Sequence, residues 1–279
     1  LYISQNQIDD FTPLFSAISQ FHSKLSHFSI TGSHLSIQNL LNCESLSCLK
    51  HLGIGGCECT DTVIQELNDY INLNKNLVSL DISGSRSLKP VLSILVGSSI
   101  KHLNLSNCEF DEKSIEALKA ISPFLTKLDL SSTNLDHYSL SDVISLLGKS
   151  RQDLLRLKLN HINLSKEKSL LIIRGLLNNN LKKWKRIELD DTHLSIDELY
   201  AYQAVFNHMP NLSFLSMGHN FEEKDAHVVS LLTEIQSLRT LRLSNSKLSS
   251  IVPQIAASKN LVDIDLSYNN LSDEDAILL

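Results

Sequence analysis

The sequence predicts an α/β fold in which short parallel strands alternate with helices along a repeating chain. Three observations support this prediction. One apolar pattern recurs about eleven times from end to end, a short polar residue follows nearly every copy, and the segments between copies carry helical apolar spacing. Each unit is therefore expected to contribute one strand to a sheet and one helix to the opposite face.

The recurring pattern places apolar residues at positions one, four and six of each unit, followed two or three residues later by Asn, Cys, Ser or Thr. It is clearest in residues 77–85, 100–108, 125–133, 238–246 and 261–269. This is the leucine-rich-repeat signature. It predicts a solenoid with a parallel β-sheet on the concave face and helices on the convex face.

The unit starts define the register of the repeats. They are Leu25, Leu49, Leu77, Ile100, Leu125, Leu154, Trp184, Leu212, Leu238 and Leu261, with a partial unit before them. We expect a single leucine-rich-repeat domain spanning residues 1–279, with about eleven repeats. The chain starts in a strand pattern and stops in a helix pattern, so we expect this domain to be truncated at both ends, since solenoids normally carry capping repeats.

A polar position closes each strand pattern. It is occupied by Asn6, Ser33, Cys57, Ser85, Cys108, Thr133, Thr192, Asn220, Ser246 and Asn269, and only Ile162 departs from it. A short hydrogen-bonding side chain there can satisfy backbone groups that lose their partners where the strand turns away.

The connecting segments carry helix-start signals. Asp111 precedes an apolar face that includes Leu118, Ser195 and Glu198 have the spacing of a capping box, and Thr60 opens a similar segment. We therefore expect helices to begin after these three positions.

Composition restricts the function classes. A net charge of -6 disfavours binding dominated by nucleic-acid phosphates, and no apolar run reaches the roughly 18 residues needed to cross a bilayer. The five cysteines form an odd number without the clusters of an extracellular cap, which predicts reduced thiols and a cytoplasmic protein.

No residues are predicted to carry catalysis or to bind a cofactor or metal, because no nucleophile elbow, phosphate loop or zinc motif occurs. His27 and His51 fall on adjacent strands of the concave face, but no carboxylate or thiolate shares their position. The glycines at 53, 55 and 56 lack the later glycine of a dinucleotide loop and are interpreted as small residues of the concave face.

A row of charged residues is the main candidate for a binding site on the concave face. Its proposed members are Lys127, Arg156, Lys158, Arg186, Glu188, Asp190, Phe214 and Arg242. Two interpretations remain open: the two carboxylates could compensate the cations within the surface, or the cations could receive an acidic segment of a partner protein, with Phe214 as an aromatic anchor.

The last repeats carry a more specific succession. Residues 212–221 end in Gly-His-Asn-Phe, residues 238–248 end in Ser-Lys-Leu, and residues 261–271 contain Ser-Tyr-Asn-Asn-Leu. This succession resembles the leucine-rich-repeat domain of the CARMIL family, which regulates capping protein and links to myosin I. The resemblance implies a scaffold in actin filament assembly at the plasma membrane or cell cortex. That family's capping-protein and membrane contacts lie outside its repeats, so no residue here inherits them.

Two alternatives belong to other classes. Residues 57–61 and 107–111 resemble the cysteine-containing repeats of F-box substrate adaptors in ubiquitin ligation, and a GTPase-activating repeat protein of the Ran type is the enzyme-regulator alternative. The sequence favours a non-catalytic protein-interaction scaffold with a protein partner on the concave face, no cofactor and no inserted membrane segment.

Overall fold

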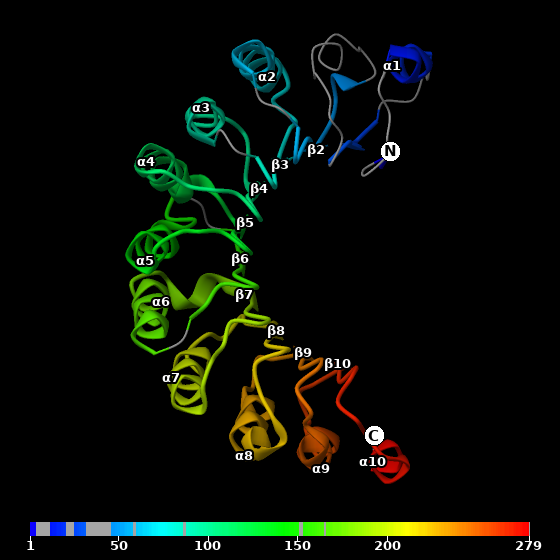
Figure 1. The fold of residues 1–279 in the computed structure, drawn as a ribbon, viewed down its shortest axis with the longest axis vertical. Coiled ribbons are helices and arrows are strands. Elements are labelled where there is room, and N and C mark those ends of the chain that lie inside the picture. Colours follow the sequence, from blue (N-terminus) through cyan, green and yellow to red (C-terminus); the bar gives the residue numbers. More distant parts are fainter. Residues whose placement is uncertain are drawn as a thin grey trace. The chain divides into compact units, whose positions relative to one another are not determined.

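A computed structural model describes residues 1–3, 12–20, 25–31, 46–57, 60–85, 88–150, 153–164 and 166–278. The chain divides into two compact units, Leu1–Leu135 and Asp136–Leu279, which are described separately. Within each unit, strands alternate with helices along the chain, and the helices lie on one side of the strands (Figure 1). The opposite side is called the helix-free face below.

The first unit contains a parallel ladder of five described strands. Its elements are α1 (Thr12–Ser19), β1 (His27–Ser29), β2 (His51–Gly53), α2 (Asp61–Leu73), β3 (Ser79–Asp81), α3 (Leu88–Ile94), β4 (His102–Asn104), α4 (Glu112–Ile121), the 3₁₀ helix η3 (Ser122–Phe124) and β5 (Lys127–Asp129). Neighbouring strands pair in chain order, so equivalent residues of successive repeats lie side by side. Tyr2 adds an isolated parallel bridge to Ser29.

The second unit repeats this arrangement. It contains α5 (His137–Leu146), β6 (Leu155–Lys158), α6 (Glu167–Leu177), η4 (Leu181–Lys183), β7 (Trp184–Glu188), α7 (Ile196–Phe206), β8 (Phe214–Ser216), η5 (Glu223–Asp225), α8 (Ala226–Val229), η6 (Ser230–Glu234), β9 (Thr240–Arg242), η7 (Ser249–Ile251), α9 (Val252–Ala256), β10 (Asp263–Asp265) and α10 (Asp273–Leu278). Strands β6 to β10 also pair in parallel and in chain order.

The apolar positions of the repeat form the core of each unit. The central strand residue is almost fully buried in Phe28, Leu52, Leu80, Leu103 and Leu128 of the first unit, and in Leu157, Ile187, Leu215 and Leu241 of the second. Side chains on either side of this residue point to the opposite face of the strand, as the two-residue period of a strand requires. The predicted α/β repeat architecture is confirmed.

The helix starts also follow the sequence signals. Asp111 Oδ1 accepts a hydrogen bond from Ser114 N at 2.7 Å and caps α4. Glu198 Oε2 accepts one from Ser195 N at 2.6 Å at the start of α7, and Thr60 caps α2. All three predicted starts are confirmed.

The polar closing position is mostly buried and hydrogen-bonded to backbone. Cys108 Sγ donates to Ile82 O at 3.4 Å, Thr133 Oγ1 to Leu130 O at 2.8 Å, and Asn269 Nδ2 to Leu243 O at 2.7 Å. Ile162, the exception, is buried as an apolar residue. Asn6 and Ser33 lie outside the described residues.

One of the predicted unit starts, Leu154, is wrong. Leu154 is 41% exposed, whereas Leu155 is fully buried and pairs with Trp184. A register shift between Leu155 and Arg156 separates this pair from the next one, Arg156 with Arg186. Strand β7 has one more residue than β6 between these two pairs, so the inward start of this repeat is Leu155.

Two observations bear on the protein's environment. Cys48, Cys57 and Cys108 are free thiols, while Cys43 and Cys59 lie outside the described residues. Among the helices that the structure describes, none is both long and apolar enough to cross a membrane.

Candidate partner-binding face

Six of the eight predicted site residues lie on strands β6 to β9 of the second unit. Arg156, Arg186 and Phe214 are register partners in one row, and Lys158, Glu188, Ser216 and Arg242 form the next row. These residues alternate with the buried central residues and therefore point away from the core. Asp190 follows β7 on the same face, whereas Lys127 lies on β5 in the first unit.

Glu188 connects two of the cations. Its carboxylate lies 3.2 Å from Lys158 Nζ and 2.5 Å from Arg186 Nε, and its side chain is only 7% exposed. Arg186 and Glu188 lie on the same strand, β7, whereas Lys158 contacts Glu188 from the neighbouring strand, β6. One buried carboxylate thus offsets two partly exposed cations, as the interpretation of an internally compensated surface expects.

Phe214 is covered by arginine. The Arg186 guanidinium carbon lies 3.5 Å from the ring centroid and that of Arg242 lies 5.2 Å from it. Both distances fit cation–π contacts. The ring is 9% exposed, so a molecule approaching this face meets the two guanidinium groups before it meets the ring.

Asp190 has a different role from the one expected. Its Oδ1 accepts hydrogen bonds from Ser216 Oγ and Gly218 N, both at 2.7 Å, and these tie β7 to the turn after β8. Burial raises the pKa of the Asp190 carboxyl, and the two hydrogen bonds act in the opposite direction. Asp190 forms no ion pair with any residue in the described part of the chain, so Glu188 alone neutralises Arg186.

Arg156 is the least compensated cation of this face, whereas Arg242 lies directly beside the Asp265 carboxylate in the strand register. Both arginines are exposed, and neither makes an ion pair with a residue that the structure describes. Arg156 lies directly beside Arg186 in the strand register, and like charges on adjacent strands repel each other. A local excess of positive charge therefore remains around Arg156 despite Glu188.

The row that includes Lys127 continues through the first unit as His102, Ser79, His51 and His27. The rings of His27 and His51 are stacked, with centroids 4.0 Å apart and planes inclined by 12°. Stacked rings direct their nitrogen atoms within parallel planes rather than toward one point. No group of three potential metal ligands occurs among the described residues.

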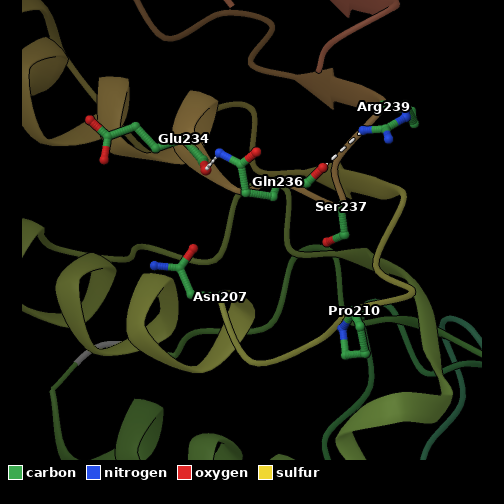
Figure 2. Close-up of a pocket in the computed structure, with 6 residues that line it drawn as sticks. All are labelled: Asn207, Pro210, Glu234, Gln236, Ser237 and Arg239. Carbon is green, nitrogen blue, oxygen red and sulfur yellow. Dashed lines mark hydrogen bonds between the residues drawn. The ribbon is translucent and has the colours of Figure 1, made fainter. Parts of the chain in front are cut away.

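A separate cavity of about 650 Å³ lies among the loops that precede β8 and β9 (Figure 2). Two of its polar side chains bind backbone: Arg239 Nη1 donates to Gln236 O at 3.0 Å and to Leu238 O at 2.9 Å, and Ser237 Oγ donates to Met209 O at 3.0 Å. These bonds hold the loops in place, and the described residues that line the cavity include no set of converging acid, base and nucleophile.

Comparisons with known proteins support the fold. No family model matches the sequence, and no curated protein matches it. A leucine-rich-repeat-containing protein of Legionella pneumophila, LegL7, aligns over 100% of this chain and 96% of its own, with 16% identity and a TM-score of 0.66. The chain has a leucine-rich-repeat fold.

A second solved structure agrees. Yeast Rad7, in its complex with Elc1, matches 95% of this chain and 78% of its own length at 17% identity, with a TM-score of 0.56. At these identities the likeness concerns the leucine-rich-repeat fold alone, and the partners of those proteins are not transferred.

Proposed function

We propose that this leucine-rich-repeat protein is a non-catalytic scaffold whose second unit binds an acidic segment of a partner protein. The observation that carries the proposal is the exposed Arg156. Like Arg242 it makes no ion pair with any described residue, but it lies beside Arg186, whereas Arg242 lies beside the Asp265 carboxylate. Glu188 compensates Lys158 and Arg186 but reaches neither Arg156 nor Arg242.

The strand register explains why an anion is suited to this face. Adjacent parallel strands lie about 4.8 Å apart, so Arg156 and Arg186 repel each other unless a negative group lies near both. Carboxylates of an extended acidic segment could accept paired hydrogen bonds from the guanidinium groups.

The proposed mode of action needs no cofactor. The residues of this face are cations, two carboxylates and a covered aromatic ring, which suit recognition of charge rather than bond breaking. Leucine-rich repeats present an extended surface on which a protein partner can lie, and this supports a binding role.

The cellular setting that we propose is regulation of actin filament assembly at the plasma membrane or cell cortex. Its support is the resemblance of residues 212–271 to the CARMIL repeats. We expect the tagged protein to co-localise with cortical actin. This co-localisation should be lost when the filaments are depolymerised. A distribution unrelated to actin would contradict this setting while leaving the binding face untouched.

A labelled hexaglutamate peptide tests the binding face by fluorescence anisotropy. Arg156→Glu is expected to weaken binding about three- to tenfold, because an exposed ion pair contributes roughly 0.2–1 kcal/mol and charge reversal replaces attraction by repulsion. The salt dependence of binding should also become flatter.

Arg174→Glu is the matched control. Arg174 is an exposed arginine of the same unit, but it lies on α6, on the other side of the strands. Its reversal changes the net charge equally and should leave most of the binding intact. Equal losses in the two variants would show that the peptide responds only to net charge, and the proposed face would be wrong.

A further inference from the structure

The first unit has a small cleft on its helix-free face, near the start of the ladder. Its volume is about 170 Å³, below the roughly 300–1,000 Å³ typical of small-molecule pockets and suited to a single side chain. The lining residues that matter here are His27, Ser29, His51, Gly53, Ser79 and Asp81. None of these residues belongs to the arginine-rich face of the second unit.

The floor of the cleft consists of small residues. A Cβ atom added to Gly53 would lie 2.6 Å from Ser29 Oγ, so glycine is needed for the Ser29 side chain to lie where it does. Ser79 continues the small-residue floor on the next strand. The sequence identified Gly53 as a small residue of this face but gave no reason to connect it with Ser79, because 26 positions separate the two.

One wall of the cleft is aromatic. His27 covers one face of the His51 ring in the stacked pair. Because β2 lies between β1 and β3, the other face of the His51 ring is turned toward Ser79, whose side chain is too short to cover it. This ring face is therefore open to a planar group that enters above Ser79.

A carboxylate lies at the end of the same strand as Ser79. Asp81 Oδ1 accepts a hydrogen bond from Ser83 N at 2.9 Å, and Oδ2 accepts one from Asn104 Nδ2 at 2.9 Å. These bonds fix the orientation of the carboxylate and leave a lone pair on each oxygen. Asp81 forms no ion pair with the residues that the structure describes.

The His51 ring does not repel a cation in this cleft at neutral pH. Burial is the largest cause of its lowered pKa, and the charges of His27, Lys127 and Lys50 lower the pKa further. The imidazole is therefore mostly uncharged at pH 7, and neither lysine lines the cleft.

We propose that this cleft binds an arginine side chain of a partner protein, with the guanidinium plane against the open face of His51 and its N–H groups directed to Asp81. Arginine suits the site better than lysine, because its planar fork both stacks on an aromatic ring and bonds a carboxylate at two points. The chemistry is opposite to that of the second unit, so the two sites are independent.

Titration with acetyl-Gly-Arg-Gly-amide at pH 7.5, followed by NMR of the His51 ring, tests the proposal. A saturable shift of the His51 signals is expected, with weaker binding of the lysine counterpart. Asp81→Asn should reduce the affinity about tenfold, since the amide keeps the size of the carboxylate but removes the charge that strengthens its hydrogen bonds to the guanidinium group. Ser79→Leu should abolish binding by filling the space above the floor.

Asp129→Asn is the matched control. Asp129 ends β5 as Asp81 ends β3, and it accepts the same hydrogen bond, from Ser131 N at 3.0 Å. It does not line the cleft, so its variant should bind as the unchanged chain does. Equal binding of the lysine peptide, equal losses at Asp81 and Asp129, or no saturable shift would each overturn the proposal. None of these outcomes bears on the acidic-segment site, which is tested with a different peptide.

Discussion

At the scale of single residues, His51 links the geometry of the first unit to pH. Its ring is stacked on His27 and half-buried on the helix-free face, and burial is the first cause of its lowered pKa. The unfolded chain binds a proton near the ordinary pKa of 6.5, above the pKa of the folded state. His51 therefore favours the folded state above about pH 6.5, and this contribution is lost as the pH falls through its lowered folded-state pKa.

The pKa of His51 can be measured directly from the ring proton shifts in an NMR pH titration. We expect a midpoint below 6.5 and a parallel decrease in the free energy of unfolding as the pH is lowered from 7 to 5. His27→Gln should move the His51 midpoint only part of the way back toward 6.5, because burial remains. A midpoint above 6.5 in the unchanged chain would contradict the assignment.

At the scale of the repeat element, Asn220 shows how one side chain holds a turn. Its Nδ2 donates to Leu189 O at 2.7 Å and Met217 O at 3.0 Å, while its Oδ1 accepts from Thr192 N at 2.9 Å. The amide thus joins the turn after β8 to the turn after β7. Asn269 makes the equivalent bonds two strands later, with Leu243 O and Ser246 N.

Asn220→Ala should destabilise the second unit by about 1–3 kcal/mol, which is the cost of leaving one buried backbone group without a hydrogen-bond partner. Denaturant unfolding followed by circular dichroism measures this loss. Asn178→Ala serves as the control, because Asn178 is exposed at the C-terminal end of α6 and its backbone angles suit alanine. If the two variants lost equal stability, the turn hydrogen bonds would not be responsible.

At the scale of the whole molecule, stability should follow the burial of each strand. Leu128, at the centre of β5, is fully buried, whereas Leu1 is 41% exposed beside the Tyr2 bridge of the same unit. Leu128→Ala should cost about 2–5 kcal/mol through cavity formation, and Leu1→Ala much less. Denaturant midpoints of the two variants compare them, and equal shifts would argue against a solenoid in which neighbours supply the stability.

The strands, their order within each unit and the helix starts could be predicted because they depend on local patterns. The apolar residues at Leu77, Leu80 and Ile82 recur in register, and a parallel ladder places equivalent residues side by side. Asp111 and Ser195 are recognisable as helix starts for the same reason, since a cap bonds within three residues of itself.

Part of the candidate face could also be predicted. Alternation along a strand places Arg156, Arg186 and Phe214 on one face in one row. The alternation does not show in which direction a long side chain extends over the face. That direction depends on neighbouring residues about 28 positions away in the chain. The burial of Glu188 between two cations and the covering of Phe214 by two arginines are such contacts.

The repeat, the leucine-rich-repeat fold and the position of each charged residue on the helix-free face follow from the order of the residues alone, because burial every second residue is a one-dimensional pattern. Three features became visible only in the folded chain: Leu155 rather than Leu154 turns inward, Asp190 bonds the next turn instead of Arg186, and Asp81 and His51 share a cleft. Each of these depends on strand register and side-chain packing between repeats, which bring together residues that the chain keeps far apart.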